Sequence, residues 1–152
     1  MSVAFRRESD EEHLEPKFEL PVPAGPNLVT QRGYDLIQAR TEQLEAAVAA
    51  EPNEETRKPL QRDLRYWRIR LTTAQIAPVS DADIVAFGTR VTFRHNGQTR
   101  TLTLVGHDEA DPTSDLIAFT APLARLMIGA EPGDEVAAPG GGMIEILNVE
   151  PA

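Results

Sequence analysis

The pattern of hydrophobic and polar positions changes its period along the chain. Between residues 34 and 48, and again between residues 60 and 74, apolar or small side chains recur every three or four positions. This spacing places each series on one face of an α-helix. The two series predict helices with matching seams. The seam positions are Tyr34, Ile37, Thr41, Leu44 and Val48 in the first helix, and Leu60, Leu64, Trp67, Leu71 and Ala74 in the second.

The residues around the two series indicate where the helices begin and end. Thr30 is a good N-cap for the first helix. That helix should end near Ala50, because Pro52 disfavours helical geometry in the residue before it. The second helix should begin near residues 53–54, with Pro59 about one turn inside, where the missing N–H does little harm. A tight turn between matching seams predicts an antiparallel hairpin with arms of roughly 30 Å.

After Pro78 the pattern becomes typical of strands. Short β-prone runs alternate with turn sequences such as His-Asn-Gly-Gln and Pro-Gly-Gly-Gly, and one short helix interrupts them. We therefore predict an α+β chain in which a helical hairpin precedes a small sheet domain. The expected strands are Phe87–Phe93, Arg100–Val105, Leu116–Thr120, Glu135–Ala138 and Met143–Val149, and the expected helix is Ala121–Ile128.

Composition narrows the possible classes of protein. The chain has 152 residues, no cysteine and a formal net charge of −9. Without cysteine, it can hold no disulfide, thiolate metal site or cysteine nucleophile. It has neither a membrane-length apolar run nor a signal peptide, so we expect a cytoplasmic protein without membrane contact. The acidic balance disfavours sequence-specific DNA binding, since phosphates attract cations.

The charge is spread unevenly, in three stretches. Residues 1–26 have 3 basic and 6 acidic side chains, residues 27–77 have 8 and 7, and residues 78–152 have 4 and 11. The first stretch also holds four prolines. We predict that it is an extended or disordered arm, that residues 27–77 are the hairpin, and that residues 78–152 are the sheet domain.

The C-terminal half contains several short motifs in a fixed order. They are FGTRVTF (Phe87–Phe93), LVGHDEAD (Leu104–Asp111), LIAFTAPLARLMIG (Leu116–Gly129), GDEV (Gly133–Val136), PGGG (Pro139–Gly142) and IEILNVE (Ile144–Glu150). Taken in this order, the motifs resemble the GreA/GreB family of transcription elongation factors, and Asn27–Ile37 resembles the start of that family's first helix.

The resemblance implies a fold and a partner. It implies an FKBP-like C-terminal domain that docks at the secondary channel of bacterial RNA polymerase, and a hairpin that points toward the active site. In the family, acidic residues at the hairpin tip help to hold a second Mg²⁺ ion, and the polymerase then cleaves backtracked RNA. No cofactor of the chain's own is expected, and Mg²⁺ would be met only inside the polymerase.

The hairpin tip departs from the family motif. It offers Glu51, Glu54 and Glu55. Glutamates in a first helical turn complement the helix dipole, and Glu54 with Glu55 as a metal-holding pair is the alternative. The resemblance also implies that the arms are shorter than the family's by about ten or more residues, which at about 1.5 Å per residue removes roughly 15–20 Å of reach. In this the chain resembles the Rnk-type relatives.

Two further groups of residues are candidate contact sites. A basic patch on the second helix could contact nascent RNA or acidic polymerase surface, with a solvated helix face as the alternative. Its members are Arg57, Lys58, Arg62, Arg65 and Arg68. For docking on the polymerase we select Asp108, Asp111, Thr120, Ala121 and Pro122, although Ala121 stands where the family has serine.

From these features we expect a binding protein and not an enzyme, with no catalytic residue and no metal site. It should bind RNA polymerase and regulate elongation, with weak or no stimulation of transcript cleavage. One alternative is a true cleavage-stimulating factor that uses the tip glutamates. Another, suggested only by the FKBP-like fold, is a peptidyl-prolyl isomerase, for which the aromatic side chains Phe87, Phe93 and Phe119 are few.

Overall fold

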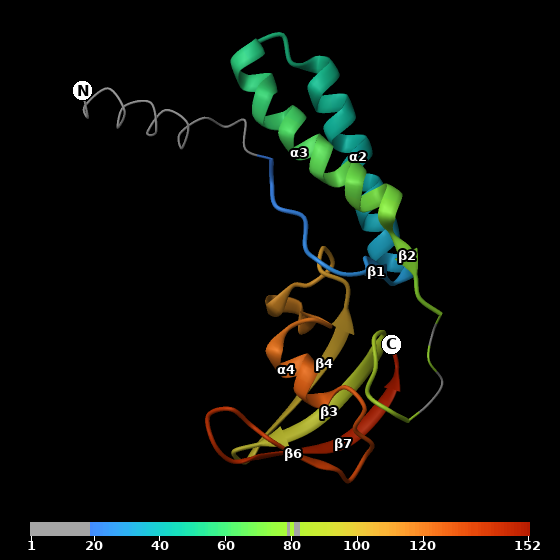
Figure 1. Ribbon diagram of the computed structural model, residues 1–152, viewed down its shortest axis with the longest axis vertical. Coiled ribbons are helices and arrows are strands. Elements are labelled where there is room, and N and C mark those ends of the chain that lie inside the picture. Colours follow the sequence, from blue (N-terminus) through green and yellow to red (C-terminus); the bar gives the residue numbers. More distant parts are fainter. Residues whose placement is uncertain (1–18, 79, 81–82) are drawn as a thin grey trace, which may run out of the picture. The chain divides into compact units, whose positions relative to one another are not determined.

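The computed structural model describes residues 19–78, 80 and 83–152. Most of the predicted arm, residues 1–18, lies outside the described residues. The described chain forms two compact units (Figure 1): residues 19–24 group with Gln38–Thr72, and Gly25–Ile37 groups with Thr73–Ala152. We call them the hairpin unit and the sheet unit. The first helix contributes to both, while the predicted limits at residues 26 and 77 stay predictions.

The helical hairpin forms as its apolar period predicts. Helix α2 spans Gln31–Ala50 and helix α3 spans Glu54–Thr73, and the two run side by side (Figure 1). Both begin at side-chain caps, because Thr30 Oγ1 accepts from the Gly33 N–H at 2.9 Å and Asn53 Oδ1 accepts from the Glu55 N–H at 2.8 Å. The predicted seams are confirmed as the buried or half-buried face of each helix.

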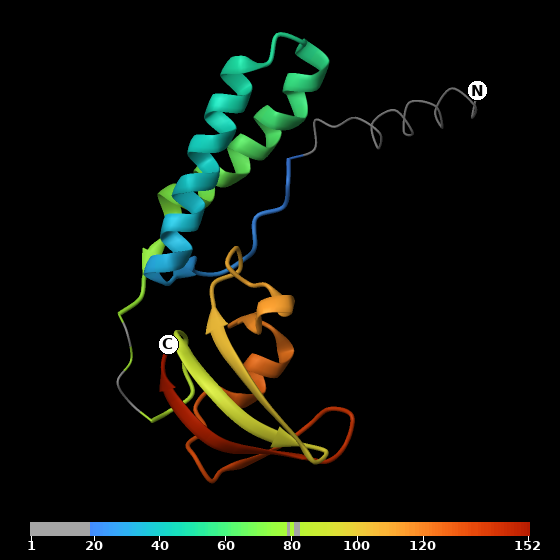
Figure 2. The ribbon, with the colours of Figure 1, turned by 180° about the vertical axis from the view of Figure 1, so that it is seen from behind.

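The sheet unit contains a five-stranded sheet in the order β5-β4-β3-β7-β6 (Figure 2). Only the β4–β5 pair is parallel. The expected strands are confirmed, with ends shifted by a few residues. They are β3 (Thr89–His95), β4 (Gln98–Val105), β5 (Leu116–Ala118), β6 (Glu135–Ala137) and β7 (Met143–Pro151).

Strands β3 and β4 are joined by the predicted turn. Asn96 and Gly97 both have positive φ, 53° and 77°, as a two-residue hairpin turn requires. The register pairs His95 with Gln98, and alternate side chains of β3 then face the core. The register of the β3–β7 pairing shifts between Thr92 and Phe93, which marks a bulge.

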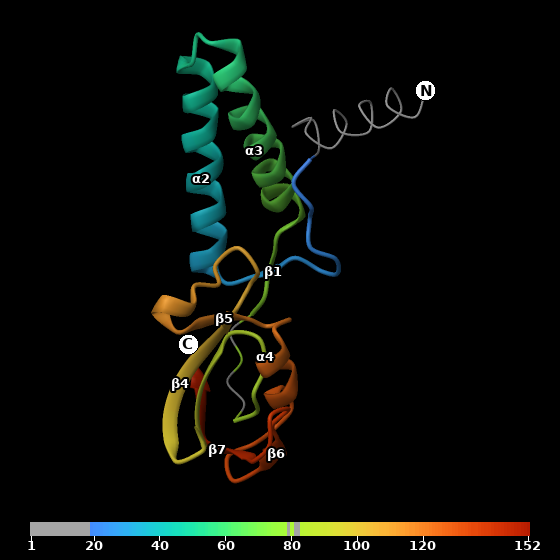
Figure 3. The ribbon, with the colours of Figure 1, turned by 90° about the vertical axis from the view of Figure 1, so that its left-hand side faces the viewer.

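One face of the sheet is covered by the short helix α4 (Pro122–Met127), which Figure 3 shows beside the strands. Ala124 and Met127 are fully buried against strand residues such as Val91, Leu104 and Ile146. Strands and helix thus share one hydrophobic core in the sheet unit. The α+β fold class, a hairpin followed by a small sheet with one short helix, is confirmed.

The predictions omitted three small elements. Strands β1 (Leu28–Val29) and β2 (Gln75–Ile76) form a short parallel pair before α2 and after α3. Asn27 strengthens this pair, since its carbonyl accepts from the Gln75 N–H at 2.9 Å and its side chain donates to Thr73 Oγ1 at 3.2 Å. A turn of 3₁₀ helix, η1 (Pro112–Ser114), also precedes β5. Among the described residues, no helix is long and apolar enough to cross a membrane.

Candidate functional site

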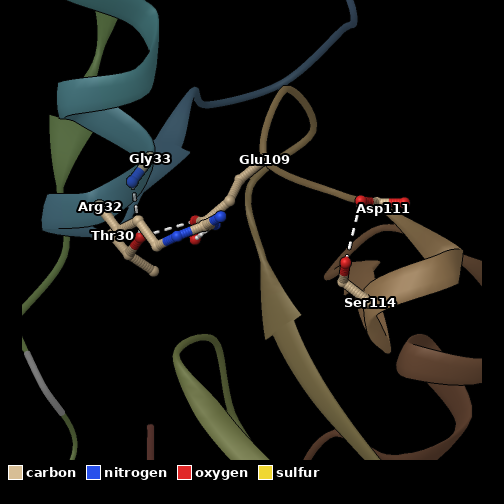
Figure 4. A network of polar contacts seen from close by, with 6 residues as sticks. All are labelled: Thr30, Arg32, Gly33, Glu109, Asp111 and Ser114. Carbon is tan, nitrogen blue, oxygen red and sulfur yellow. Dashed lines mark hydrogen bonds and ion pairs between the residues drawn. The ribbon is translucent and has the colours of Figure 1, made fainter.

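The loop after β4 holds a buried carboxylate at the start of α2 (Figure 4). Glu109 Oε1 accepts a hydrogen bond from Thr30 Oγ1 at 2.6 Å, and Oε2 accepts one from Arg32 Nη1 at 2.8 Å. The Glu109 side chain is only 5% exposed, whereas that of Arg32 is 65% exposed. Both contacts lie within the sheet unit. A carboxylate here also complements the positive end of the helix dipole.

Two glycines let the chain approach closely around this carboxylate. A Cβ on Gly33 would lie 2.9 Å from Glu109 Oε1, and a Cβ on Gly106 would lie 2.4 Å from the Leu28 carbonyl oxygen. A side chain at Gly106 would therefore clash with backbone, whereas one at Gly33 would displace the Glu109 carboxylate. We call Thr30, Arg32, Gly33, Gly106 and Glu109 the helix clamp, because they fasten the first turn of α2 to the loop after β4.

The contacts of the helix clamp were not predicted from the sequence. The motif Gly-His-Asp-Glu-Ala-Asp reads as a solvated acidic turn, yet its central Glu109 is buried. The sequence did contain one signal for these contacts. Gly33 lies in one motif that resembles the GreA/GreB family, and Gly106 and Glu109 lie in another. Without the fold, nothing shows that Gly33 and Glu109 meet across 76 positions in the sequence.

Asp111, a predicted docking residue, has a structural role of its own. Its carboxylate caps η1, accepting from the Thr113 N–H at 3.1 Å, from Thr113 Oγ1 at 2.7 Å and from Ser114 Oγ at 3.1 Å (Figure 4). The hydrogen bond from the Thr113 side chain is the main cause that lowers the pKa of Asp111, followed by that from Ser114. The residue remains exposed, so capping and an outward contact are compatible.

The other predicted docking residues lie around the loop after β4 and the start of α4. Asp108 and Ala121 are half-buried, and Thr120 and Pro122 are exposed. Ala121 occupies the N-cap of α4 without a side-chain cap, and Pro122 occupies the first helical position. The proline-fixed corner is therefore present, while the hydroxyl that serine would supply is absent.

The hairpin tip is closed by its own side chains. Arg57 donates to the Glu51 and Pro52 carbonyl oxygens, both at 3.0 Å, which satisfies two acceptors in the turn between α2 and α3. Glu51 Oε2 accepts from the Asn53 N–H at 3.1 Å, and Glu55 pairs with Lys58 at 3.3 Å. Of the three tip glutamates, two are thus engaged in contacts within the tip.

The tip glutamates do not form a metal cluster. Across residues 19–78, 80 and 83–152, no group of three or more His, Cys, Asp or Glu side chains is arranged to hold a metal ion. Glu54 and Glu55 lie in the first turn of α3, where negative charge is favoured by the helix dipole. Whether they contact Mg²⁺ inside a polymerase stays a prediction.

The predicted basic patch lies on α3, and several of its cations pair with acids of the hairpin unit. Arg65 forms a two-point ion pair with Glu19, from Nε to Oε1 and from Nη2 to Oε2, the latter at 2.9 Å. Arg68 pairs with Glu45 of α2 at 3.1 Å. Arg62 is half-buried. The patch is therefore partly neutralised by the protein itself.

Two cavities lie in the sheet unit, and different phenylalanines line them. The larger, of about 720 Å³, has a mostly apolar wall that includes Phe87, Val105 and Leu116. The smaller, of about 330 Å³, is bordered by Phe93 and by the loop at Pro139. Phe87 packs edge-to-face on Phe119 with 5.2 Å between ring centroids. Neither of these two cavities gathers all three phenylalanines.

The sequence of the sheet unit matches a known family. Residues 80–151 match the family described as the C-terminal domain of the transcription elongation factors GreA/GreB. Transcription elongation factor GreA of Halorhodospira halophila is 43% identical over 79 residues, which cover 47% of this chain and 50% of that protein. GreA of Vibrio cholerae is 39% identical over 97 residues, which cover 59% of this chain and 60% of that protein.

Over its C-terminal part, residues 80–151, the chain is thus similar to the GreA/GreB family. The matched part of the chain spans about half the length of these curated relatives.

The crystal structure of GreA factor homolog 1 (Gfh1) of Thermus thermophilus covers 83% of this chain and 99% of its own, with 14% identity and a TM-score of 0.40. GreA/GreB from Nitrosomonas europaea covers 84% and 99%, with 21% identity and a TM-score of 0.39.

Proposed function

We propose that this chain is a Gre-type elongation factor that binds bacterial RNA polymerase at the secondary channel and regulates elongation, with weak or no stimulation of transcript cleavage. The observation that carries the proposal is the family match over residues 80–151, joined to a preceding hairpin of two 20-residue helices. In this proposal the chain is a cytoplasmic binding protein rather than an enzyme, and it meets Mg²⁺ only inside the polymerase.

The tip supports the restriction on cleavage. Holding Mg²⁺ requires carboxylate oxygens at about 2.0–2.1 Å from the ion. Here Glu51 accepts from the Asn53 N–H and Glu55 pairs with Lys58, which leaves Glu54 as the tip acid for which no such contact is described. One carboxylate on a short hairpin is a weaker metal holder than a pair on a long one.

Docking is proposed for the corner that precedes α4 and for the loop after β4. Thr120 and Pro122 are exposed on either side of Ala121, and Asp111 is exposed close to the start of β5. Asp108 completes this surface. Asp108 and Asp111 would complement a basic surface on the polymerase. Such charges raise the association rate more than they raise the affinity.

The test uses cognate RNA polymerase stalled in a backtracked complex with Mg²⁺. The chain is titrated, and both binding and RNA length are followed. We expect saturable binding with little acceleration of cleavage. A chain that does not bind would overturn the proposal.

Cleavage that is accelerated and then lost in Glu54→Gln/Glu55→Gln would support the alternative of a true cleavage factor. Glu131→Gln/Glu135→Gln is the matched control, because both acids are exposed and lie outside the tip. The isomerase alternative gains no support from the cavities, which separate Phe87 from Phe93.

A further inference from the structure

The larger cavity of the sheet unit lies on the face of the sheet that α4 does not cover. Thr103 and Val105 alternate along β4 with Leu102 and Leu104, and of these four only the two leucines belong to the core beneath α4. Val105 is nevertheless only 1% exposed. Its burial must therefore come from residues that cover the opposite face. All the residues that line the cavity belong to the sheet unit.

The wall of this cavity is mostly apolar. Phe87, Val105 and Leu116 line it on the side of the sheet, and Ile76 and Pro78 line it from the end of the hairpin. Its volume of about 720 Å³ falls within the range of about 300–1,000 Å³ that is typical of small-molecule sites. Ile76 is 48% exposed, so apolar surface remains uncovered here. Such a cavity suits the apolar body of a ligand.

Two arginines line the same cavity from different elements. Arg32 belongs to the first turn of α2, and Arg90 belongs to β3. Arg32 Nη1 pairs with Glu109 at 2.8 Å (Figure 4), and Arg90 Nη1 pairs with Glu150 at 2.7 Å. A guanidinium has several N–H donors in a planar fork. The described pairs therefore leave further donors on both side chains, which are 65% and 45% exposed.

The charges around the cavity favour an anionic head group on the ligand. Among the described residues, the charged side chains that line it are Arg32, Arg90 and Glu109. Both oxygens of Glu109 already accept hydrogen bonds from the helix clamp, and this side chain is only 5% exposed. The guanidinium groups are the accessible charges, and their geometry fits a carboxylate or phosphate.

An aromatic body fits the wall best. The ring of Phe87 is held by its edge-to-face contact with Phe119, so it offers a fixed surface on which another ring can pack. Guanidinium groups also stack on aromatic faces. Ribose hydroxyls would be costly to bury against the apolar wall, because they would lose hydrogen bonds to water. The wall thus favours an apolar ring over a nucleoside.

We propose that this cavity binds a small aromatic anion, an apolar ring system that bears one carboxylate or phosphate. The ring packs against Phe87 and Val105, and the head group accepts from Arg32 and Arg90. The inference goes beyond the proposed function and does not depend on it, because it involves neither the polymerase nor the hairpin tip.

The test is isothermal titration calorimetry of the full chain with four naphthalene probes. Naphthyl phosphate and naphthoate should bind with a Kd of order 0.1 mM. Neutral naphthol should bind about tenfold more weakly, and naphthylmethylammonium more weakly still. Binding of either anion with this preference supports the proposal, and the tighter of the two identifies the head group. No binding of either anion, or equal binding of naphthol, would overturn it.

Adenosine monophosphate tests the choice of an apolar body. It shares the phosphate with naphthyl phosphate but adds a ribose and a polar base. We expect it to bind about tenfold more weakly than naphthyl phosphate. Tighter binding of the nucleotide would overturn the assignment of the cavity to apolar rings.

A matched pair of variants tests the arginine contact. Arg90→Gln should weaken naphthyl phosphate binding about tenfold. Arg94→Gln is the control, because Arg94 lies on the same face of β3 and pairs with Glu145 at 2.6 Å but does not line the cavity. It should change the Kd less than about twofold. Equal losses in the two variants would show a general effect of charge and overturn the contact.

A second pair of variants tests the location. Thr103→Trp should fill the cavity and abolish binding. Thr101→Trp should not, since Thr101 lies two positions earlier on the same face of β4 and does not line the cavity. Circular dichroism checks that both variants fold, and the Arg90→Gln result stands whether or not they do. Unchanged binding by a folded Thr103→Trp chain would contradict the site.

NMR of the parent chain gives an independent location. On addition of naphthyl phosphate, the amide signals of Gly88 and Thr103, which line the larger cavity, should shift. Those of Gln98 and Gly140, which line the smaller cavity, should not. Exchange of the Gly33 amide hydrogen should also slow, because a ligand held by Arg32 stabilises the first turn of α2. Shifts confined to the smaller cavity would overturn the inference.

Discussion

At the residue scale, Glu109 combines burial with charge. Its carboxylate is held by Thr30 and Arg32 and lies at the start of α2. Glu109→Gln keeps the shape but loses the charge that both donors and the helix dipole favour. We expect the free energy of unfolding to fall by about 1–3 kcal/mol, measured by urea titration with far-UV circular dichroism.

Glu131→Gln is the control for Glu109, because Glu131 is exposed and its side chain should contribute little. A loss in Glu109→Gln no larger than that in Glu131→Gln would show that the buried carboxylate adds nothing net. Such a result is physically conceivable, since desolvation of a buried ion offsets much of its attraction to donors.

A second residue-scale prediction concerns Gly106. Its missing Cβ leaves room for the Leu28 carbonyl, which would otherwise be 2.4 Å away, and backbone cannot yield as a side-chain tip can. Gly106→Ala should lower the free energy of unfolding by about 1–3 kcal/mol. Gly140→Ala is the matched control, since a Cβ at that position would meet nothing within 4 Å and the φ of Gly140 is not in the positive region. Equal thermal midpoints for the two variants would contradict the close approach.

At the element scale, the hairpin depends on its seam. Leu44 is 2% exposed and Leu36, on the same helix, is 42% exposed. Leu44→Ala removes buried methyl groups and leaves a cavity, so it should cost about 2–5 kcal/mol of unfolding free energy. Leu36→Ala should cost well under about 1 kcal/mol, because alanine also has the higher helix propensity. Urea titrations of both variants check this, and similar losses would mean that the seam is misassigned.

The elements that could be predicted are those with strong local signals. Both hairpin helices begin, and the first one ends, within one residue of the expected positions, because Thr30, Asn53 and Pro52 act through neighbouring backbone groups. The β3–β4 turn could be predicted from Asn96 and Gly97. Both have positive φ, which asparagine and glycine adopt more readily than other residues.

What could not be predicted depends on partners far apart in the chain. Strands β1 and β2 have two residues each and pair across the length of the hairpin, from Leu28 to Gln75. Two residues carry no alternation to detect. Glu109 likewise has no local sign of burial, since an acid beside Asp108 and Asp111 is typical of a surface turn. The Glu19–Arg65 contact was missed for the same reason.

At the scale of the whole molecule, buried apolar side chains are found in both described units. The core of the sheet unit is made of residues between Val85 and Val149, including Ile146 at 0% exposure. The hairpin has its own core around Leu44 and Leu64. Helix α2 is shared between the units, so the backbone passes from one core to the other within a continuous helix.

This arrangement predicts that the two units unfold in separable steps. The single tryptophan, Trp67, lies in α3 and reports on the hairpin by fluorescence. Ile146→Ala should lower the stability of the sheet unit by about 2–5 kcal/mol, seen in the circular dichroism of its strands, while the Trp67 transition moves much less. Leu44→Ala should instead shift the Trp67 fluorescence transition and change the circular dichroism transition of the strands much less. If both probes shift together in both variants, the two units unfold as one cooperative structure. The continuous helix α2 would then couple the two units during unfolding.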